Sequence, residues 1–97
     1  MNVVKVRLHP NSDEQIIVND DITFQKFLWI AKLLIANFAG TKTKELLGLD
    51  QVFIDVNISG SLVVLAWDSL AGFSIQCQNS TLREQILKFL ESQSLPD

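Results

Sequence analysis

The segment DDITFQKFLWIAKLLIANFAG, residues 20–40, decides the fold because it combines a clear period with a start signal and a stop signal. Its apolar side chains recur at spacings of three and four residues, which places them on one face of an α-helix. Asp20, Asp21 and Thr23 are typical helix-capping residues, and Gly40 is a typical terminator. The sequence therefore predicts a helix with a seven-residue core stripe: Phe24, Phe27, Leu28, Ala31, Leu34, Ile35 and Phe38.

Two large apolar residues, Trp29 and Leu33, fall roughly opposite the centre of that stripe and lie four residues apart, so we expect them to touch each other. Two interpretations stay open for this pair. Either another element of the same chain covers it, or it lies in an oligomer or partner interface, because tryptophan is enriched at the centres of such interfaces.

The composition predicts a single globular domain that spans residues 1–97. Hydrophobic residues make up 47% of the chain and charged residues 20%, which is unlike the low hydrophobicity of disordered chains. Cys77 is the single cysteine, and the first ten residues lack the apolar core of a secretion signal. Lys32 and Asn37 interrupt the most apolar segment, which is shorter than the roughly 20 residues of a membrane span. We therefore expect a soluble cytoplasmic protein.

The charge distribution argues against nucleic acid as a partner. The net charge is −3, with two basic against five acidic residues after residue 50. Nucleic-acid binders normally present a basic face to the phosphates. The four cations that could form a local patch, Lys5, Arg7, Lys42 and Lys44, are better explained as solvated surface.

Alternation with a period of two predicts strands on both sides of the helix. Residues 3–8 are expected to form an edge strand, and residues 15–18 return beside it after a polar loop. Residues 41–50 are read as a polar connection in which residues 44–47 make one helical turn. Near the end of the chain, the capping-box pair Thr81 and Glu84 predicts a second helix. Its core face comprises Leu82, Ile86, Phe89 and Leu90.

Residues 51–59 and 62–68 are predicted to form a hairpin with a type II′ turn at Gly60 and Ser61. In that register Ile58 faces Val63, Val56 faces Leu65 and Ile54 faces Trp67. A third strand adds Phe73, Ile75 and Cys77 to the same apolar face.

The opposite face of this hairpin is not fully polar. Leu62 and Val64 point away from the core, together with Ala66, and Phe53 lies near them. Central strands often carry apolar residues on both faces, so strand propensity is one explanation. Cover by another subunit or a partner protein is the other.

Few residues suggest catalytic or metal-binding chemistry. Cys77 continues a core alternation, which indicates inert packing rather than a nucleophile. His9, Asp13 and Glu14 lie in a loop without a recognised metal-ligand spacing. There is no glycine-rich phosphate loop, no HExxH and no CxxC pair, so no cofactor is expected.

Asp55 and Asp68 form the one carboxylate pair that is considered as a catalytic site. The predicted register places Asp55 opposite Ala66, so Asp68 is its diagonal neighbour and within reach of a shared proton or ion. The plainer interpretation is two solvated carboxylates.

Together these patterns predict an α+β domain of order ββαβββα, with a mainly antiparallel sheet and two helices on one face. The leading functional hypothesis is a non-enzymatic protein-binding domain, self-associating as a homodimer, without nucleic acid or membrane as a partner. Alternatives are an immunity- or antitoxin-like inhibitor of a basic protein, or a small enzyme that uses Asp55 and Asp68. The candidate partner-binding residues are Trp29, Leu33, Phe53, Leu62 and Val64.

Overall fold

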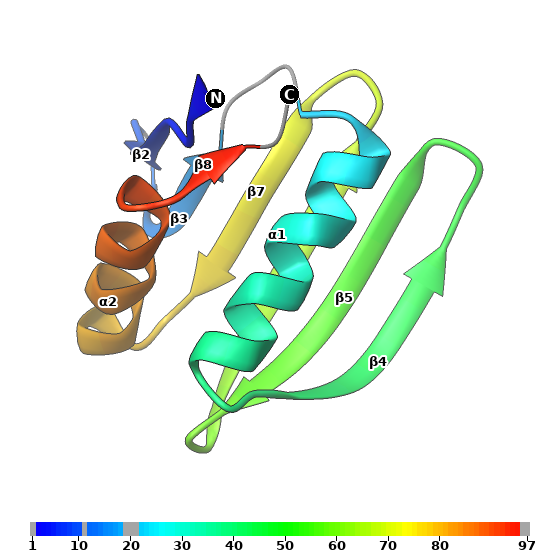
Figure 1. Cartoon of the computed structure of the whole chain (residues 1–97). Helices are drawn as coiled ribbons and strands as arrows, with labels where there is room; N and C mark the ends of the chain where they lie inside the picture. The colour runs from blue at the N-terminus through cyan, green and yellow to red at the C-terminus, as the bar shows by residue number, and fades with distance from the viewer. Residues whose placement is uncertain (1, 11, 19–21, 96–97) are drawn as a thin grey trace.

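The computed structural model describes residues 2–10, 12–18 and 22–95. Six antiparallel strands form one sheet in the order β2-β3-β7-β6-β5-β4, and both helices lie on the same side of it (Figure 1). The α+β class and the two helices on one face are therefore confirmed. The sheet comprises β2 (Val6–His9), β3 (Ser12–Val18), β4 (Thr41–Leu47), β5 (Gln51–Ile58), β6 (Ser61–Asp68) and β7 (Gly72–Cys77). The helices are α1 (Phe24–Asn37) and α2 (Ser80–Glu91).

The predicted strand at residues 3–8 is divided into two pieces. β1 (Asn2–Val3) pairs with β8 (Ser94–Leu95) in a separate two-stranded sheet, and β2 forms one edge of the main sheet. Val4 lies between β1 and β2, where it is buried and its N–H donates to the carbonyl of Gln93 at 3.0 Å. The ends of the chain are therefore joined by β pairing beside α2.

β4 is the main addition to the predicted strands, because residues 41–47 form an edge strand instead of a polar connection with a helical turn. Leu46 pairs with Phe53 and Leu47 with Val52, and the register shifts between Lys42 and Lys44. Every residue of β4 is exposed, so neither face of the strand has an apolar period for the sequence to reveal. Its conformation follows from pairing with β5, which only the folded sheet provides.

The β5–β6 hairpin is shifted by two residues from the predicted register. Val56 pairs with Val63, Ile54 with Leu65 and Val52 with Trp67. The turn falls on Ser59 and Gly60, whose φ angles are 52° and 86°, which excludes the predicted type II′ turn because only its first central residue has positive φ. Because side chains alternate with a period of two, a two-residue shift leaves every side chain on its predicted face.

Helix α1 begins as predicted, with Thr23 Oγ1 accepting the N–H of Lys26 at 3.2 Å, whereas Asp20 and Asp21 lie outside the described residues. Its buried face is rotated by roughly 50° from the predicted stripe at 100° per residue. Ile30, which the stripe omits, is fully buried, whereas Phe24 is partly exposed. The buried residues of α1 are Phe27, Ile30, Ala31 and Leu34.

Gly40 has a different role from the one predicted. The left-handed residue that ends α1 is Ala39, with φ 51°, while the N–H of Gly40 donates to the carbonyl of Ile35 at 2.8 Å. A Cβ atom on Gly40 would lie 2.8 Å from Val56 Cγ1. Glycine is thus required at position 40 because the chain passes close to β5.

Helix α2 begins two residues earlier than the predicted capping box, because Asn79 rather than Thr81 is its cap. Asn79 Oδ1 accepts the N–H of Leu82 at 3.0 Å. The predicted core face is otherwise correct: Leu82, Ile86 and Leu90 are buried, while Phe89 is partly buried and its ring meets that of Phe38 at 5.6 Å. Both helices and the facing side of the sheet share one hydrophobic core.

Candidate protein-binding surfaces

The side of the main sheet opposite the helices, called here the helix-free face, carries three of the five predicted partner-binding residues. Phe53, Leu62 and Val64 alternate along β5 and β6 with residues that are buried under the helices. The register extends an apolar row across the face, because Leu46 pairs with Phe53 and Phe53 pairs with Ala66. The prediction that these residues point away from the core is confirmed.

The exposed apolar residues of the helix-free face lie on β4, β5 and β6. Leu62 is 57% exposed and Leu46 53%, and Phe53 is also exposed, whereas Val64 and Ala66 are half-buried by their neighbours. These residues lie on three adjacent strands. The apolar surface is therefore continuous across strands and is not a set of isolated side chains.

A shallow hollow of about 400 Å³ lies on this face, near the β5–β6 turn. Leu62 and Val64 form its apolar wall, and Gln76 and Gln78 form its polar wall. Every residue that lines the hollow is uncharged, which suits contact with a neutral surface rather than with a small charged ligand.

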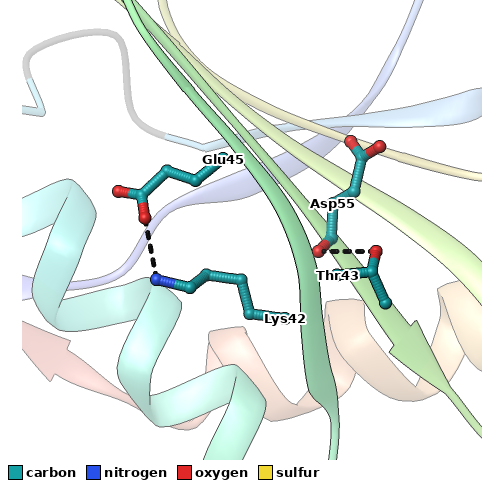
Figure 2. Close-up of polar contacts among 4 residues, drawn as sticks. All are labelled: Lys42, Thr43, Glu45 and Asp55. Atoms are coloured by element: carbon teal, nitrogen blue, oxygen red, sulfur yellow. Dashed lines mark hydrogen bonds and ion pairs between the residues drawn. The ribbon is translucent and has the colours of Figure 1, made fainter.

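One pair of opposite charges lies beside the apolar row on this face. Lys44 is directly opposite Asp55 in the β4–β5 register. In Figure 2 the carboxylate of Asp55 points to the opposite side of β4 from the ion pair between Lys42 and Glu45, whose atoms are 2.8 Å apart. Thr43 Oγ1 donates to the carbonyl of Asp55 at 3.3 Å and thereby ties the shifted part of β4 to β5.

The two predicted binding residues on α1 are partly covered by the chain itself. Trp29 is half-buried and packs against the core, and Leu33 is also half-buried. The rotation of the helix described above moves Leu33 toward the buried face but leaves Trp29 roughly opposite that face, so the rotation does not explain the cover of Trp29. A contact of Trp29 and Leu33 with a partner stays a prediction.

The structure does not bring Asp55 and Asp68 together, so their predicted diagonal pairing is wrong. Asp55 pairs with Val64, and Asp68, four residues further along β6, pairs with Gln51. At about 3.3 Å per residue, the two positions are separated by roughly 13 Å along the strands. The predicted pairing depended on a register that the hairpin does not adopt.

Asp68 instead stabilises the β6–β7 turn. Its carboxylate accepts hydrogen bonds from Gln51 Nε2 at 2.7 Å and from the N–H groups of Leu70 and Ala71 at 2.7 Å and 3.0 Å. These donors, with Gln51 contributing most, lower the pKa of Asp68 below its ordinary value. The residue is a turn cap in its charged form.

Cys77 is buried in the core, as predicted, and burial raises the pKa of its thiol. A raised pKa and a core position both oppose nucleophilic reactivity. Within the described ranges, no group of three or more histidine, cysteine or acidic side chains is arranged to hold a metal ion. His9, Asp13 and Glu14 therefore do not form such a group.

The sequence did not single out the exposed leucines at the ends of two hairpins. Leu49, in the β4–β5 turn, is 103% exposed, and Leu70, in the β6–β7 turn, is 96% exposed. The signal that could have found them is chemical, because both leucines stand in turns that are normally built from polar residues and glycine.

No family model matches this chain, and neither the curated proteins nor the solved structures contain a significantly similar one. Neither helix in the described part of the chain has both the length and the hydrophobicity needed to cross a membrane.

Proposed function

We propose that the chain is a non-enzymatic protein-binding domain that forms a homodimer by packing the helix-free faces of two sheets together. The observation that supports this function is the exposed apolar surface on that face, in which Leu46 and Phe53 form a row across β4 and β5 and Leu62 lies further along β6. Neither of the two described helices covers this face, so its apolar side chains have no second layer of the chain to pack against. A second sheet is a standard way to cover such a face.

The size of the face suits a stable dimer. Six strands spaced about 4.8 Å apart, each contributing roughly seven residues of 3.3 Å, give a face of roughly 650 Å² per copy. Two copies then bury about 1,300 Å², which is within the range of specific protein interfaces. A two-fold axis through the face brings the same residues of both copies together, as isologous dimers require.

The charge of the face also favours a second copy over a highly charged partner. Lys44 and Asp55 are already opposite each other, and the hollow beside Leu62 is lined by uncharged side chains. Burial of the β4–β6 part of the face therefore has a low desolvation cost, while the exposed charges of the face, Arg7 and Asp13, lie on β2 and β3 at its other side. A cytoplasmic location, which we infer from the lone buried Cys77, completes the proposal.

The experiment is sedimentation velocity on the wild type and on a Phe53→Thr, Leu62→Thr double variant. Threonine keeps the β propensity of both positions while it removes most of the apolar surface. We expect a dimer for the wild type and a monomer for the double variant, with unchanged circular dichroism.

Two matched controls locate the interface. Leu49→Ser, Leu70→Ser removes two exposed leucines from elsewhere on the molecule, and the variant should stay dimeric. Trp29→Ala, Leu33→Ala should also stay dimeric, provided that it folds. A monomeric wild type, or dissociation caused by the α1 variant and not by the sheet variant, would overturn the proposal.

A further inference from the structure

Two hairpin turns lie next to each other at one end of the sheet, namely residues 48–50 between β4 and β5 and residues 69–71 between β6 and β7 (Figure 1). The N–H of Ser69 donates to the carbonyl of Asp50 at 2.9 Å, which joins the two turns directly. Gln51 Nε2 donates to Asp68 at 2.7 Å and makes a second bridge at their base. The two turns are thus one structural unit.

Each turn is held by its own hydrogen bonds. Asp68 Oδ1 accepts the N–H groups of Leu70 and Ala71, and the N–H of Gly48 donates to the carbonyl of Gln51 at 2.8 Å. The backbones that carry Leu49 and Leu70 are therefore fixed, although both side chains are almost completely exposed. A fixed backbone lowers the conformational entropy lost when such side chains enter a binding pocket.

Apolar surface continues from the turns onto the helix side of the sheet. Leu47, at the end of β4, is exposed and lies in one row with Val52 and Trp67. Phe24, at the start of α1, is partly exposed, and its ring lies 5.5 Å from that of Trp67. The surface called here the hairpin end consists of four exposed residues: Phe24, Leu47, Leu49 and Leu70.

The charges beside these leucines are acidic. Asp50 lies in the first turn and Asp68 begins the second, and residues 48–51 and 68–71 contain no lysine or arginine. Acidic flanks repel the phosphates of nucleic acids and of anionic lipids, whereas they attract a protein surface that carries lysine or arginine. Because the side chains of Leu49 and Leu70 are almost completely exposed, a partner must supply a pocket to bury them.

We propose that the hairpin end binds a different protein, by inserting Leu49 and Leu70 into an apolar pocket whose rim carries basic side chains that pair with Asp50. The four apolar residues of the hairpin end lie in the turns and on the helix side of the sheet, so the dimer and the second partner can bind at the same time. The proposal goes beyond self-association and does not depend on it.

A second copy of the chain is a poorer match for this pocket. The hollow between β2 and α2 is lined by Leu8, Leu87 and Arg83, but Glu84 also lines it. Arg83 already donates to the carbonyl of Cys77 at 2.9 Å. In that hollow, the acidic hairpin end of a second copy would be repelled by the carboxylate of Glu84. The guanidinium of Arg83 is already hydrogen-bonded within its own chain.

The first stage of the test places a photo-crosslinking amino acid at position 49 or 70 of the full chain, and at position 8 as a control, in the native host. The expected result is a protein adduct at positions 49 and 70 that is absent at position 8. Mass spectrometry then identifies the crosslinked residue of the partner, which should lie among apolar residues with lysine or arginine nearby.

The second stage titrates the purified partner with the wild type, the Leu49→Ser, Leu70→Ser variant and Asp50→Asn. We expect the leucine variant to weaken binding by at least about tenfold. Added salt should weaken wild-type binding and have less effect on Asp50→Asn, because a charge pair has been removed. Leu8→Ser changes an exposed leucine at the other edge of the sheet and should leave the affinity unchanged.

Several results would overturn the proposal. They are crosslinks to a second copy, crosslinks to lipid, no adduct at either position, or an affinity that is insensitive to both leucines. Co-sedimentation with vesicles of phosphatidylcholine and phosphatidylserine that depends on Leu49 and Leu70 would indicate a membrane surface instead. Sedimentation velocity of the leucine variant distinguishes these failures from failure of the dimer, because its self-association should be unaffected.

Discussion

The two faces of the main sheet are built from the same strands but differ in what folding requires of them. On β6, Leu65 points under the helices and is 1% exposed, whereas Leu62 points to the helix-free face and is 57% exposed. The covered face is wholly apolar where β5, β6 and β7 contribute to it, whereas the helix-free face mixes leucine, valine and phenylalanine with polar side chains. The covered face therefore accounts for folding, whereas the apolar residues of the other face need a different explanation.

Thiol reactivity should separate the two faces most strongly. Cys77 lies on the covered face, and its buried thiol with a raised pKa should react with a disulfide reagent only when the fold opens. A Leu62→Cys variant adds a thiol to the helix-free face, and we expect that thiol to react faster by a factor of roughly a hundred or more. Dilution that dissociates the proposed dimer should further accelerate labelling of the introduced thiol, without any effect on Cys77. Equal rates for the two thiols would contradict the difference between the faces.

Truncation of matched leucines is expected to give the next largest effect. Leu65→Ala leaves a cavity in the core and should lower the free energy of unfolding by about 2–5 kcal/mol. Leu62→Ala removes an exposed side chain and should change the stability of the monomer by less than about 1 kcal/mol. Urea denaturation followed by circular dichroism measures both. Similar losses at the two positions would mean that the helix-free face also contributes to the core.

Adjacent substitutions at the end of α1 test how closely the chain approaches the covered face. Gly40→Ala should destabilise the protein by about 1–3 kcal/mol, because the new Cβ would meet Val56 on β5. Ala39→Gly should instead stabilise it by about 0.5–1 kcal/mol, because glycine adopts the left-handed conformation of Ala39 more easily. Thermal unfolding should give a lower melting temperature for Gly40→Ala and a higher one for Ala39→Gly. A neutral Gly40→Ala would show that the packing against Val56 is loose.

The smallest effect is expected from Asp68, at the end of the helix-free face. Its pKa is lowered in the folded state, so its charged form adds stability above the ordinary value of 3.8, and this contribution is lost as the pH falls toward the folded pKa. Asp68→Asn should therefore lower the melting temperature slightly at neutral pH and have little effect in strong acid. Asp13→Asn, at an exposed position on β3, serves as the control. A difference that stays constant with pH would contradict the role of the charge.

The sequence could predict the elements whose side chains are buried on one side. The period of α1 and the alternation of β5, β6 and β7 are imposed by the core, and a register error of two residues did not change which side chains face it. Asp55 and Asp68 show the limit of this reasoning, because the distance between two residues depends on the register itself.

The sequence did not predict the segments that have no buried face. β4 is exposed on both faces, so pairing with β5 decides its conformation and no period marks it in the sequence. The same reason explains the candidate sites: Phe53, Leu62 and Val64 were found through alternation, whereas Leu49 and Leu70 lie in turns where no alternation exists. The rotation of α1, which brings Ile30 into the core, is likewise decided by tertiary packing.

The pairing of β3 with β7 has a consequence for how the chain folds. Gln15 pairs with Gln76, so strands from opposite ends of the sequence meet within the sheet. The β2–β3 hairpin is synthesised first, yet its neighbours β7 and α2 are synthesised last, and closing so long a loop slows folding. Until then, the edges of β3 and β7 are both unpaired. At high concentration the hairpin of one molecule can pair with β7 of another, and the product is a domain-swapped dimer with the same strand contacts as the monomer.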